Sequence, residues 1–272
     1  MKAVIFSGSH SRHLFIHEEV IKHFDDLLVI FMKREEIMPS PKKEWSNHDK
    51  KNFNLHFSNR KKIEDKIYGN LNEDKIFNQQ EIIKITSREL NSQKIALKIK
   101  KFNADFCFIF GTDLILEPVI NVLPENKINL HLGLSPFYKG SATLFWPFYF
   151  LQPQFAGVTF HQITKDIDAG DIIHQSVPDL EYGDTIHEVA AKCVIKAKKD
   201  IPTIIDYFKK NNSFLSIKQK KSGKIWFMSD FHVSHLRTIY DLYNDKIVDE
   251  YLKGNLCKKR PDIYSIYNNQ NK

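Results

Sequence analysis

The sequence predicts an α/β fold in which a Rossmann-like, mostly parallel sheet is flanked by helices and followed by a small C-terminal appendage made of a hairpin and a helix. Apolar runs of strand length recur along the chain, and segments with helical periodicity lie between them. The runs are unbroken, which is typical of parallel strands covered on both faces. With 272 residues, 42% of them hydrophobic, the chain can bury a substantial core. We expect one main domain over residues 1–211 and the appendage over residues 212–272.

The first half of the chain alternates between strand-like and helix-like segments. An apolar opening is followed by a helical stretch and a second apolar run, and a later helical stretch leads into a third run. Between them, a polar stretch with two prolines indicates a long loop. The expected elements are a strand over 1–8, a helix ending near 24, a strand over 27–32, a loop over 34–55, a helix over 88–102 and a strand over 105–111.

The second half continues this alternation into the appendage. Three more apolar runs are followed by a long helical segment, for which Asp184 is the expected cap. A proline inside that segment predicts an interruption. The expected elements are strands over 127–131, 157–164 and 171–177, a helix from Thr185 to about 210 interrupted near Pro202, a hairpin with one limb in Lys218–Lys224, and a helix over Leu236–Leu252.

Charged and aromatic residues follow the predicted long loop at intervals of four. His56, Arg60, Glu64 and Tyr68 therefore share one face of a predicted helix, and Arg60 is close enough to Glu64 to pair with it. The simpler interpretation is an exposed ion pair on a surface helix. The alternative is that this face borders a ligand pocket.

Three polar residues carry the chemical signal. Asn129 and His131 end an apolar run, and residues two apart in a strand project from the same face, so both aim at one spot. Asp168 follows a later run, on a loop able to fold back over that spot. Singly these features are weak, because an Asn-x-His pair is often just a satisfied polar pair and Asp-Ala-Gly is usually a turn. Together, an amide, an imidazole and a carboxylate can pass an acyl group between nitrogens.

A loop punctuated by proline and glycine, Leu132–Ser141, lies between these residues. With it, residues 100–180 resemble the formyltransferases that use 10-formyltetrahydrofolate, a family that includes glycinamide ribonucleotide, methionyl-tRNA and amino-sugar formyltransferases. The resemblance places Asn129, His131 and Asp168 on the family's catalytic positions.

The loop also departs from the usual family pattern. It reads Gly133-Leu134-Ser135-Pro136 where many members have Ser-Leu-Leu-Pro, and Lys139 stands where they have arginine. This form is similar to a branch found among surface-polysaccharide genes. The identity of the acceptor therefore cannot be carried over from the better-known members.

The resemblance implies that an acceptor amine attacks the formyl carbon, which creates an oxyanion, while the folate nitrogen gains a proton before it leaves. Asn129 would donate an N–H to the oxyanion. His131 would donate to the same oxygen or shuttle a proton. Asp168 would orient the imidazole, raise its pKa, or hold a water that relays the proton. The residues alone leave these roles open, and no metal is expected because the cofactor already activates the formyl carbon.

The resemblance also places the 10-formyltetrahydrofolate cofactor against two segments. One is the turn after the strand over 105–111, and the other is the loop that carries Asp168, whose backbone groups would bond the pterin edge. An alternative for the turn is a strand-to-helix connection with Asp113 as a helix N-cap. The expected cofactor-binding residues are Phe110, Gly111, Asp113, Leu114, Ile115, Thr164, Lys165, Asp166 and Ile167.

The expected acceptor is a small amine, phosphorylated or nucleotide-linked, and a nucleotide-linked amino sugar is preferred by analogy with the polysaccharide-associated members. The first strand-to-helix turn favours anions, although it has one glycine and no dinucleotide fingerprint, and a plain capped turn is an equal interpretation. The tRNA-acting relatives carry a full β-barrel domain after the catalytic one, for which the last 61 residues are too short. The residues expected to contact the acceptor are Gly8, Arg12, Ser135 and Tyr138.

Composition bears on the competing functions. The net charge of +7 and the pI near 9.0 are compatible with nucleic-acid binding, but the lysines are spread along the chain. The densest cluster, Lys218–Lys224, is either a solvated turn or an attractor of a phosphorylated acceptor. The alternatives are a methionyl-tRNA-type or other small-amine formyltransferase, a formyltetrahydrofolate hydrolase, whose relatives carry an extra regulatory domain, and a non-catalytic folate- or nucleic-acid-binding protein.

Cellular context is suggested by two features of the sequence. The apolar opening is too brief for a signal peptide or a membrane span, so no membrane partner is expected. Cys107, Cys193 and Cys257 are scattered without metal-ligand spacing, and Cys107 lies in an apolar run, which favours a buried thiol in a reducing cytoplasm. A homodimer is compatible with these expectations.

Overall fold

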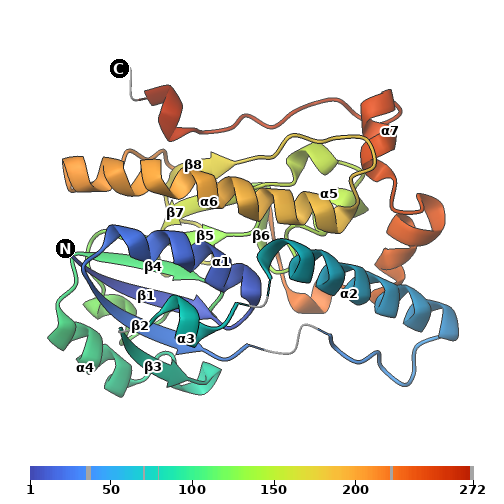
Figure 1. Cartoon of the computed structure of the whole chain (residues 1–272). Coiled ribbons are helices and arrows are strands. Elements are labelled where there is room, and N and C mark those ends of the chain that lie inside the picture. Colours follow the sequence, from blue (N-terminus) through green and yellow to red (C-terminus); the bar gives the residue numbers. More distant parts are fainter. Residues whose placement is uncertain (35–37, 70, 79, 221–222, 270–272) are drawn as a thin grey trace.

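The computed structural model describes residues 1–34, 38–69, 71–78, 80–220 and 223–269. Within these residues, seven strands form one sheet in the order β3-β2-β1-β4-β5-β7-β8, and two short strands, β6 and β9, pair with each other (Figure 1). The strands are β1 Lys2–Gly8, β2 Asp26–Met32, β3 Glu81–Ile85, β4 Phe106–Phe110, β5 Lys127–His131, β6 Tyr138–Gly140, β7 Val158–Gln162, β8 Ile172–Ser176 and β9 Lys224–Trp226.

Helices connect these strands. The α-helices are α1 Ser11–Val20, α2 Asn47–Tyr68, α3 Glu73–Ile76, α4 Gln93–Phe102, α5 Trp146–Tyr149, α6 Ile186–Asn211 and α7 Ile247–Lys253. Shorter 3₁₀ turns occur at Ile21–His23, Ser87–Glu89, Ile120–Val122, Pro153–Phe155, Met228–Asp230, Val233–His235 and Ile266–Asn269, and a π turn occurs at Thr238–Leu242.

The predicted mostly parallel sheet is confirmed. Strands β1 to β5 pair in parallel, whereas β7 and β8 pair antiparallel to their neighbours. Successive residues of β1 enter two cores: Ala3 and Ile5 pack in one, and Val4 and Phe6 in the other. Helices α1 and α6 cover the first face and α4 the second (Figure 1). Because both faces are buried, the strand is apolar throughout.

Helix α6 begins and continues differently from the prediction. Thr185 caps it, and Glu188 reaches back to complete a capping box. The expected cap, Asp184, is wrong, because its carboxylate accepts instead from the Glu181 N–H and from Lys192. The helix also runs through Pro202 without the expected interruption and ends at Asn211, where the appendage is expected to begin.

The appendage does not form the expected hairpin. Its strand β9 pairs in parallel with β6, while Ile217 forms an antiparallel bridge with Ile172 at the start of β8. Both segments therefore pair with strands that lie within residues 1–211. The helix expected over Leu236–Leu252 is divided into the π turn and α7, because Asn244 and Asp245 adopt positive φ between them.

The last described segment returns to the sheet. The Gln175 N–H donates to the Tyr264 carbonyl at 2.9 Å, and the Tyr264 N–H donates to Gln175 Oε1 at 2.9 Å. In Figure 1 the red C-terminal segment passes back from α7 toward β8. Residues 212–269, the expected appendage, thus contact the preceding part of the chain at several places.

The structure also shows the state of the three cysteines and the character of the helices. Cys107 and Cys193 are buried free thiols, as expected for Cys107, and Cys257 is an exposed free thiol. Among the helices in the described part of the chain, none combines the length and apolar character needed to cross a bilayer.

Candidate active site

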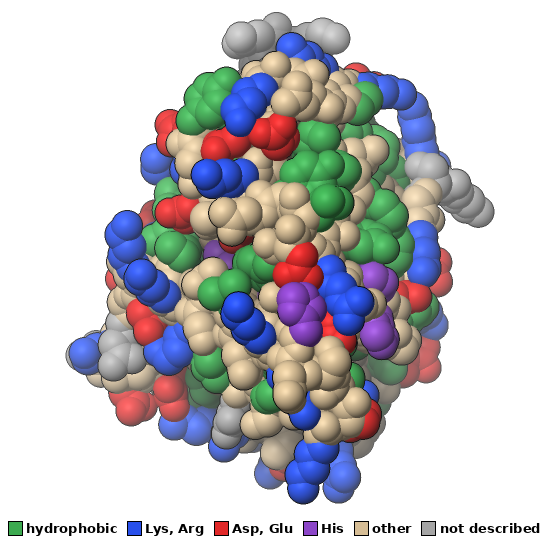
Figure 2. Space-filling model, turned by 90° about the vertical axis from the view of Figure 1, so that its right-hand side faces the viewer, with side chains coloured by type: hydrophobic (Ala, Val, Ile, Leu, Met, Phe, Trp, Pro, Cys, Tyr) green, Lys and Arg blue, Asp and Glu red, His purple; other side chains and the backbone are tan. Residues whose placement is uncertain are grey.

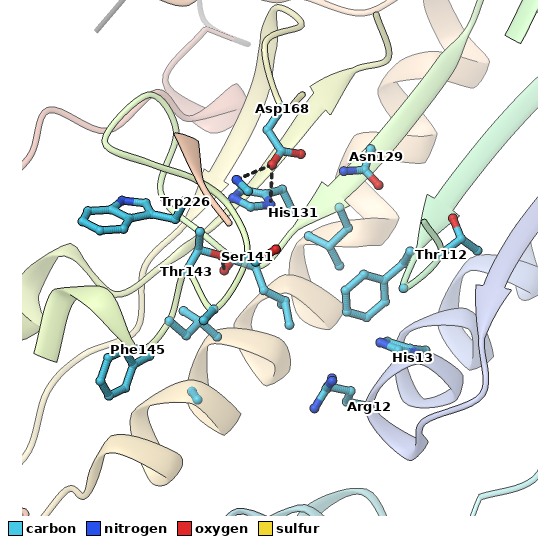
Figure 3. Close-up of a pocket in the computed structure, with 18 of the residues that line it drawn as sticks. Arg12, His13, Thr112, Asn129, His131, Ser141, Thr143, Phe145, Asp168 and Trp226 are labelled. Atoms are coloured by element: carbon cyan, nitrogen blue, oxygen red, sulfur yellow. Dashed lines mark hydrogen bonds and ion pairs between the residues drawn. The ribbon is translucent and has the colours of Figure 1, made fainter. Parts of the chain in front are cut away.

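A cavity of about 950 Å³ lies at the carboxyl ends of β1, β4 and β5 (Figure 3). Residues 109–115 and 163–168 line one region of it, and side chains from α1, α2 and α6 line another. The appendage adds a wall through Trp226 and its neighbours. Because parallel strands meet at one edge of the sheet, loops distant in the sequence share this space.

The predicted catalytic residues converge on this cavity. Asn129 and His131 lie on β5, and Figure 3 shows Asp168 pointing toward the His131 ring, with Asn129 nearby. Asp168 Oδ2 lies 3.3 Å from His131 Nδ1. The other ring nitrogen, Nε2, donates to the Tyr138 carbonyl at 2.9 Å. Each nitrogen of His131 therefore faces an oxygen acceptor.

Burial and these acceptors act on His131 in opposite directions. Burial is the larger influence and lowers the pKa of His131, whereas the Asp168 carboxylate and the Tyr138 carbonyl raise it, and the net pKa lies below the ordinary value. The ring is thus neutral near pH 7. When it gains a proton, the Asp168 carboxylate and the Tyr138 carbonyl both stabilise the charged form. Such a group can accept a proton and release it again.

The Asp168 carboxylate is ionised, because the groups around it outweigh the effect of burial on its pKa. Burial raises the pKa of Asp168, but His131, His161 and the Gly140 N–H lower it by more, so the pKa lies below its ordinary value. The Gly140 N–H donates to Oδ2 at 2.8 Å. This carboxylate remains a negative charge beside the imidazole throughout the neutral range.

His161, which is not among the residues that the sequence predicts to be catalytic, also lies in the site. Its Nδ1 donates to the Gln162 carbonyl at 2.7 Å, which leaves Nε2 to accept from Asn129 Nδ2 at 3.1 Å. That Nε2 also lies 3.4 Å from Asp168 Oδ1. His161 is opposite Asn129 in the pairing of β7 with β5, and this register is the signal that the sequence alone does not display.

The loop after β5 passes over the imidazole at Gly133. A Cβ on Gly133 would lie 2.4 Å from His131 Nε2 and 2.5 Å from the Tyr138 carbonyl oxygen. Only glycine allows this approach, which lets the Tyr138 carbonyl reach Nε2. The glycine that departs from the common family pattern therefore has a local structural reason.

Two residues expected to contact the acceptor do not line the cavity. Ser135 is fully buried in the loop, where its N–H donates to Thr159 and its carbonyl accepts from Gln175. The Tyr138 hydroxyl points away and donates to Gln152 at 3.1 Å. Both expectations are wrong for the side chains, because the loop presents backbone groups toward His131 instead.

The region expected to hold the cofactor lines the cavity almost completely. Phe110, Gly111, Asp113, Leu114, Ile115, Thr164, Asp166 and Ile167 all border it. Lys165 does not, because its side chain is 71% exposed and pairs with Glu117. Thr112, which lies in the same turn after β4, also borders the cavity, and its Oγ1 is buried without a partner among the described residues.

Asp113 is not a helix cap. No described helix begins there, and its carboxylate accepts from Arg34 and from the Ser87 hydroxyl. The turn after β4 instead depends on Gly111, which has a φ of 86°. A Cβ on Gly111 would lie 2.5 Å from the His13 ring. Gly111 and Gly8 together make room for His13, so Gly8 lies behind this ring and does not line the cavity.

The predicted helix face lies in the cavity and not on the surface. His56, Arg60, Glu64 and Tyr68 of α2 all line it, and three of them, excluding Arg60, are buried. The interpretation as an exposed ion pair is therefore wrong. Glu64 accepts from Arg12 at 2.7 Å, and the Arg60 guanidinium lies 4.6 Å from the centre of the Phe57 ring.

Arg12, a residue expected to contact the acceptor, lines the cavity on the opposite side from Asp168 (Figure 3). Besides Glu64, it contacts His10 Nδ1 at 3.0 Å. Its Nε is buried without a partner among the described residues. The helix N-terminus of α1 and this guanidinium together favour an anionic group there.

Comparison with known proteins supports a family assignment. A curated relative, methionyl-tRNA formyltransferase from Sulfurihydrogenibium sp. (strain YO3AOP1), is 35% identical over 83 residues. That match covers 30% of this chain and only 26% of the relative, so the chain spans about a quarter of that relative's length.

Two solved structures share the fold. The N-formyltransferase from Helicobacter canadensis, in complex with folinic acid and dTDP-3-aminofucose, is 19% identical and has a TM-score of 0.56, covering 92% of this chain and 82% of that one. Phosphoribosylglycinamide formyltransferase from Anaplasma phagocytophilum is 16% identical and has a TM-score of 0.55, covering 84% and 98%. At these identities the similarity shows the fold alone.

The sequence profile described as "Formyl transferase" matches residues 40–205, which is well over half of the chain. The matched segment includes Asn129, His131 and Asp168, and the suspected family relationship is confirmed. The chain belongs to the formyl transferase family.

Proposed function

We propose that the protein transfers a formyl group from 10-formyltetrahydrofolate to the amine of a nucleotide-linked amino sugar. The observation that carries this proposal is the convergence of Asn129, His131 and Asp168 in one cavity, with His131 between two acceptors. The family assignment supports the reaction class, and the geometry supports the roles proposed for the residues.

The region beside residues 109–115 fits a folate. It combines apolar walls from Phe110, Leu114 and Ile115 with the loop after β7, which contributes Thr164, Asp166 and Asp168. The unpartnered Thr112 hydroxyl gives one buried group that a ligand can satisfy. Bound there, 10-formyltetrahydrofolate supplies a formyl carbon already activated for attack by an amine.

In the proposed mechanism, His131, Asp168 and Asn129 have separate roles in the transfer. Neutral His131 accepts the proton that the amine loses as its nitrogen bonds to the formyl carbon. The same proton can then return to the nitrogen whose bond to that carbon breaks, so the imidazole ends the cycle neutral. Asp168 stabilises the charged imidazole in between. Asn129 keeps one amide N–H for the carbonyl oxygen on which negative charge develops, while the other bonds to His161.

The acceptor region supports an anionic, partly aromatic ligand. Arg12 and Arg60 line it, and the carboxylate of Glu64 is already bonded to Arg12. Phe145, Phe231 and Trp226 add aromatic walls. A phosphate or diphosphate would pair with the guanidinium groups and a base or sugar ring would pack on the aromatics. The Helicobacter canadensis structure, which contains a dTDP-linked amino sugar and folinic acid, supports the same ligand class.

Surface charge gives less support to nucleic-acid binding. On the face drawn in Figure 2, basic side chains lie beside acidic ones. Among the ion pairs of the described residues, Arg237 pairs with Asp49 and His48 contacts Asp241. Nucleic-acid sites usually gather basic groups without such partners.

A mass-detected screen tests the proposal. Purified protein and 10-formyltetrahydrofolate are incubated separately with amino-sugar nucleotides, glycinamide ribonucleotide and methionyl-tRNA. We expect an amino-sugar nucleotide to gain the mass of one formyl group together with release of tetrahydrofolate that depends on the amine. Formylation of methionyl-tRNA alone, or release of tetrahydrofolate without an amine, would contradict the proposal and indicate the tRNA-type enzyme or the hydrolase.

A further inference from the structure

The turn that carries Asp168 has an unfavourable backbone. Asp168 has a φ of 46°, in the left-handed region that residues other than glycine adopt infrequently. Two residues later the turn presses against β7, since a Cβ on Gly170 would lie 1.8 Å from the Gln162 carbonyl oxygen. A backbone of this kind persists where its surroundings hold it in place.

Gln219 of the appendage holds this turn. Its Nε2 donates to the Asp168 carbonyl at 2.8 Å and to the Gly170 carbonyl at 2.7 Å, so both hydrogens of one amide are used on the two sides of the turn. Two residues before Gln219, Ile217 exchanges two backbone hydrogen bonds with Ile172, of 2.8 and 2.9 Å. This bridge fixes the segment beside β8 and brings Gln219 to the turn.

The same appendage also supports the carboxylate end of Asp168. The Gly140 N–H that donates to Asp168 Oδ2 belongs to β6, which pairs with β9. Next to it, the Ser141 N–H donates to the Trp226 carbonyl at 2.7 Å. A Cβ on Gly140 would lie 2.1 Å from that carbonyl oxygen, so the two strands are in close contact. The appendage therefore contacts the Asp168–Gly170 turn through the Gln219 side chain. It contacts the strand that carries Gly140 through the backbone of β9.

We propose that Gln219 is a positioning residue for formyl transfer, acting through Asp168. Its amide keeps the Asp168–Gly170 turn in the conformation that places the carboxylate 3.3 Å from His131 Nδ1. Without that amide the turn relaxes, and the carboxylate no longer aligns with the imidazole. The inference rests on the proposed function for its catalytic consequence, but its structural part stands on the contacts alone.

The variant Gln219→Leu tests the inference. Leucine has a similar size and no donor, and it also removes Gln219 Oε1, which is buried without a partner among the described residues. The matched control is Gln93→Leu, the same change at an exposed position that begins α4. The first readout is the titration of His131 by NMR in protein with ¹⁵N-labelled histidine, assigned with the His131→Gln variant.

Because Asp168 raises the pKa of His131, a carboxylate that has moved away leaves a lower pKa in Gln219→Leu than in the wild type. His161 and Lys139 also face His131 and are unchanged in the variant, so they do not cause the shift. The second readout is kinetic: kcat should fall roughly ten- to a hundredfold while the KM of each substrate stays within about twofold. Gln93→Leu should match the wild type in both.

A folded Gln219→Leu protein with an unchanged His131 titration would overturn the inference. If that variant does not fold, Gln219→Asn serves instead, because its shorter side chain keeps the donor but cannot span both carbonyls. The same shift is then expected, and its absence counts against the proposal. If the wild type transfers no formyl group, the proposed function fails, while the titration still decides whether Gln219 positions Asp168.

Discussion

At the residue scale, the site depends on one imidazole whose two nitrogens face a carboxylate and a backbone carbonyl. Burial keeps His131 neutral, while Asp168 and the Tyr138 carbonyl stabilise the charged form when it appears. A proton carrier needs both properties. In the proposed mechanism, proton transfer therefore depends on the distances around this one ring.

The Asp168→Asn variant should lose roughly a hundredfold or more in kcat and keep its fold. The substitution preserves the size of the side chain and removes the charge that stabilises the imidazolium. Single-turnover kinetics and circular dichroism measure the two expectations. Asp179→Asn, which makes the same change at an exposed position, is the control, and a wild-type rate in Asp168→Asn would contradict the assignment.

The pH dependence follows from the direction of the shift at His131. Since its pKa lies below the ordinary value of about 6.5, the ring remains neutral through neutral pH, and kcat/KM should fall only on acidification below that value. In Asp168→Asn the residual activity should fall at still lower pH, because the charge that raises the His131 pKa is gone. Profiles of kcat/KM against pH test this, and an acid limb above pH 6.5 would contradict it.

Gly133→Ala should reduce kcat roughly tenfold or more, because the added Cβ would lie 2.4 Å from His131 Nε2 and the loop or the ring must move. A second substitution, Gly183→Ala, is a suitable control, since its Cβ would meet no atom within 4 Å, although its positive φ carries a small cost. Parallel assays and thermal melts separate the local effect from loss of stability. Equal activity in both variants would show that the close approach is unimportant.

Residue-level prediction succeeded where it relied on strand geometry. A separation of two placed Asn129 and His131 on one face, and the family resemblance supplied Asp168. His161 was missed, because its partnership with Asn129 depends on the register of two antiparallel strands. Ser135 and Tyr138 failed for the opposite reason, since spacing does not tell whether a loop presents its side chains or its backbone.

At the scale of elements, α2 and the start of α1 form one wall of the cavity, where we propose that the acceptor binds. The four-residue spacing correctly placed His56, Arg60, Glu64 and Tyr68 together, but it could not tell solvent from cavity. Helix α2 begins at Asn47 with Ser46 as its cap, so it extends into the predicted long loop. The predicted hairpin was wrong because β9 pairs with β6, which is distant in the sequence. Local sequence patterns do not show which distant strands pair.

Arg12→Gln should raise the KM of a phosphorylated acceptor roughly tenfold or more with little change in kcat. The double variant Arg12→Gln/Glu64→Gln distinguishes two causes, because Arg12 also neutralises the buried Glu64 carboxylate. If Arg12 binds the acceptor, KM stays high in both variants. A normal KM in the double variant would show that Arg12 serves only to balance Glu64.

At the scale of the whole molecule, a cluster around the buried Asp200 carboxylate joins the C-terminal segment to β8 and α6. Asp200 of α6 accepts from the Ser176 hydroxyl at 2.6 Å, from Lys196 at 2.7 Å and from the Tyr267 hydroxyl at 2.9 Å, and His174 Nε2 lies 3.1 Å away. One carboxylate thus connects β8, α6 and the appendage. The stability of the appendage depends on the charge at this point.

The Asp200→Asn variant should be less stable at neutral pH by about 3 kcal/mol. Burial raises the pKa of Asp200, but hydrogen bonds from His174, Lys196 and Ser176 lower it further, so the folded pKa lies below the unfolded value of about 3.9. This stabilisation is complete above the unfolded pKa and is lost as pH falls through the folded one. Urea melts from pH 7 to pH 3 should therefore show the difference between the proteins shrinking below about pH 4. A constant difference would contradict this account.

The returning appendage has a consequence for solubility. β8 is the last strand of the sheet, and its outer backbone is met by Ile217 at one end and by Tyr264 near the other. An uncovered strand of this kind, rich in isoleucine, is a template on which further copies of a chain assemble edge to edge. By covering the edge of β8, the segment after α6 therefore protects the chain from aggregation. Expression of residues 1–211 alone would leave this edge strand exposed.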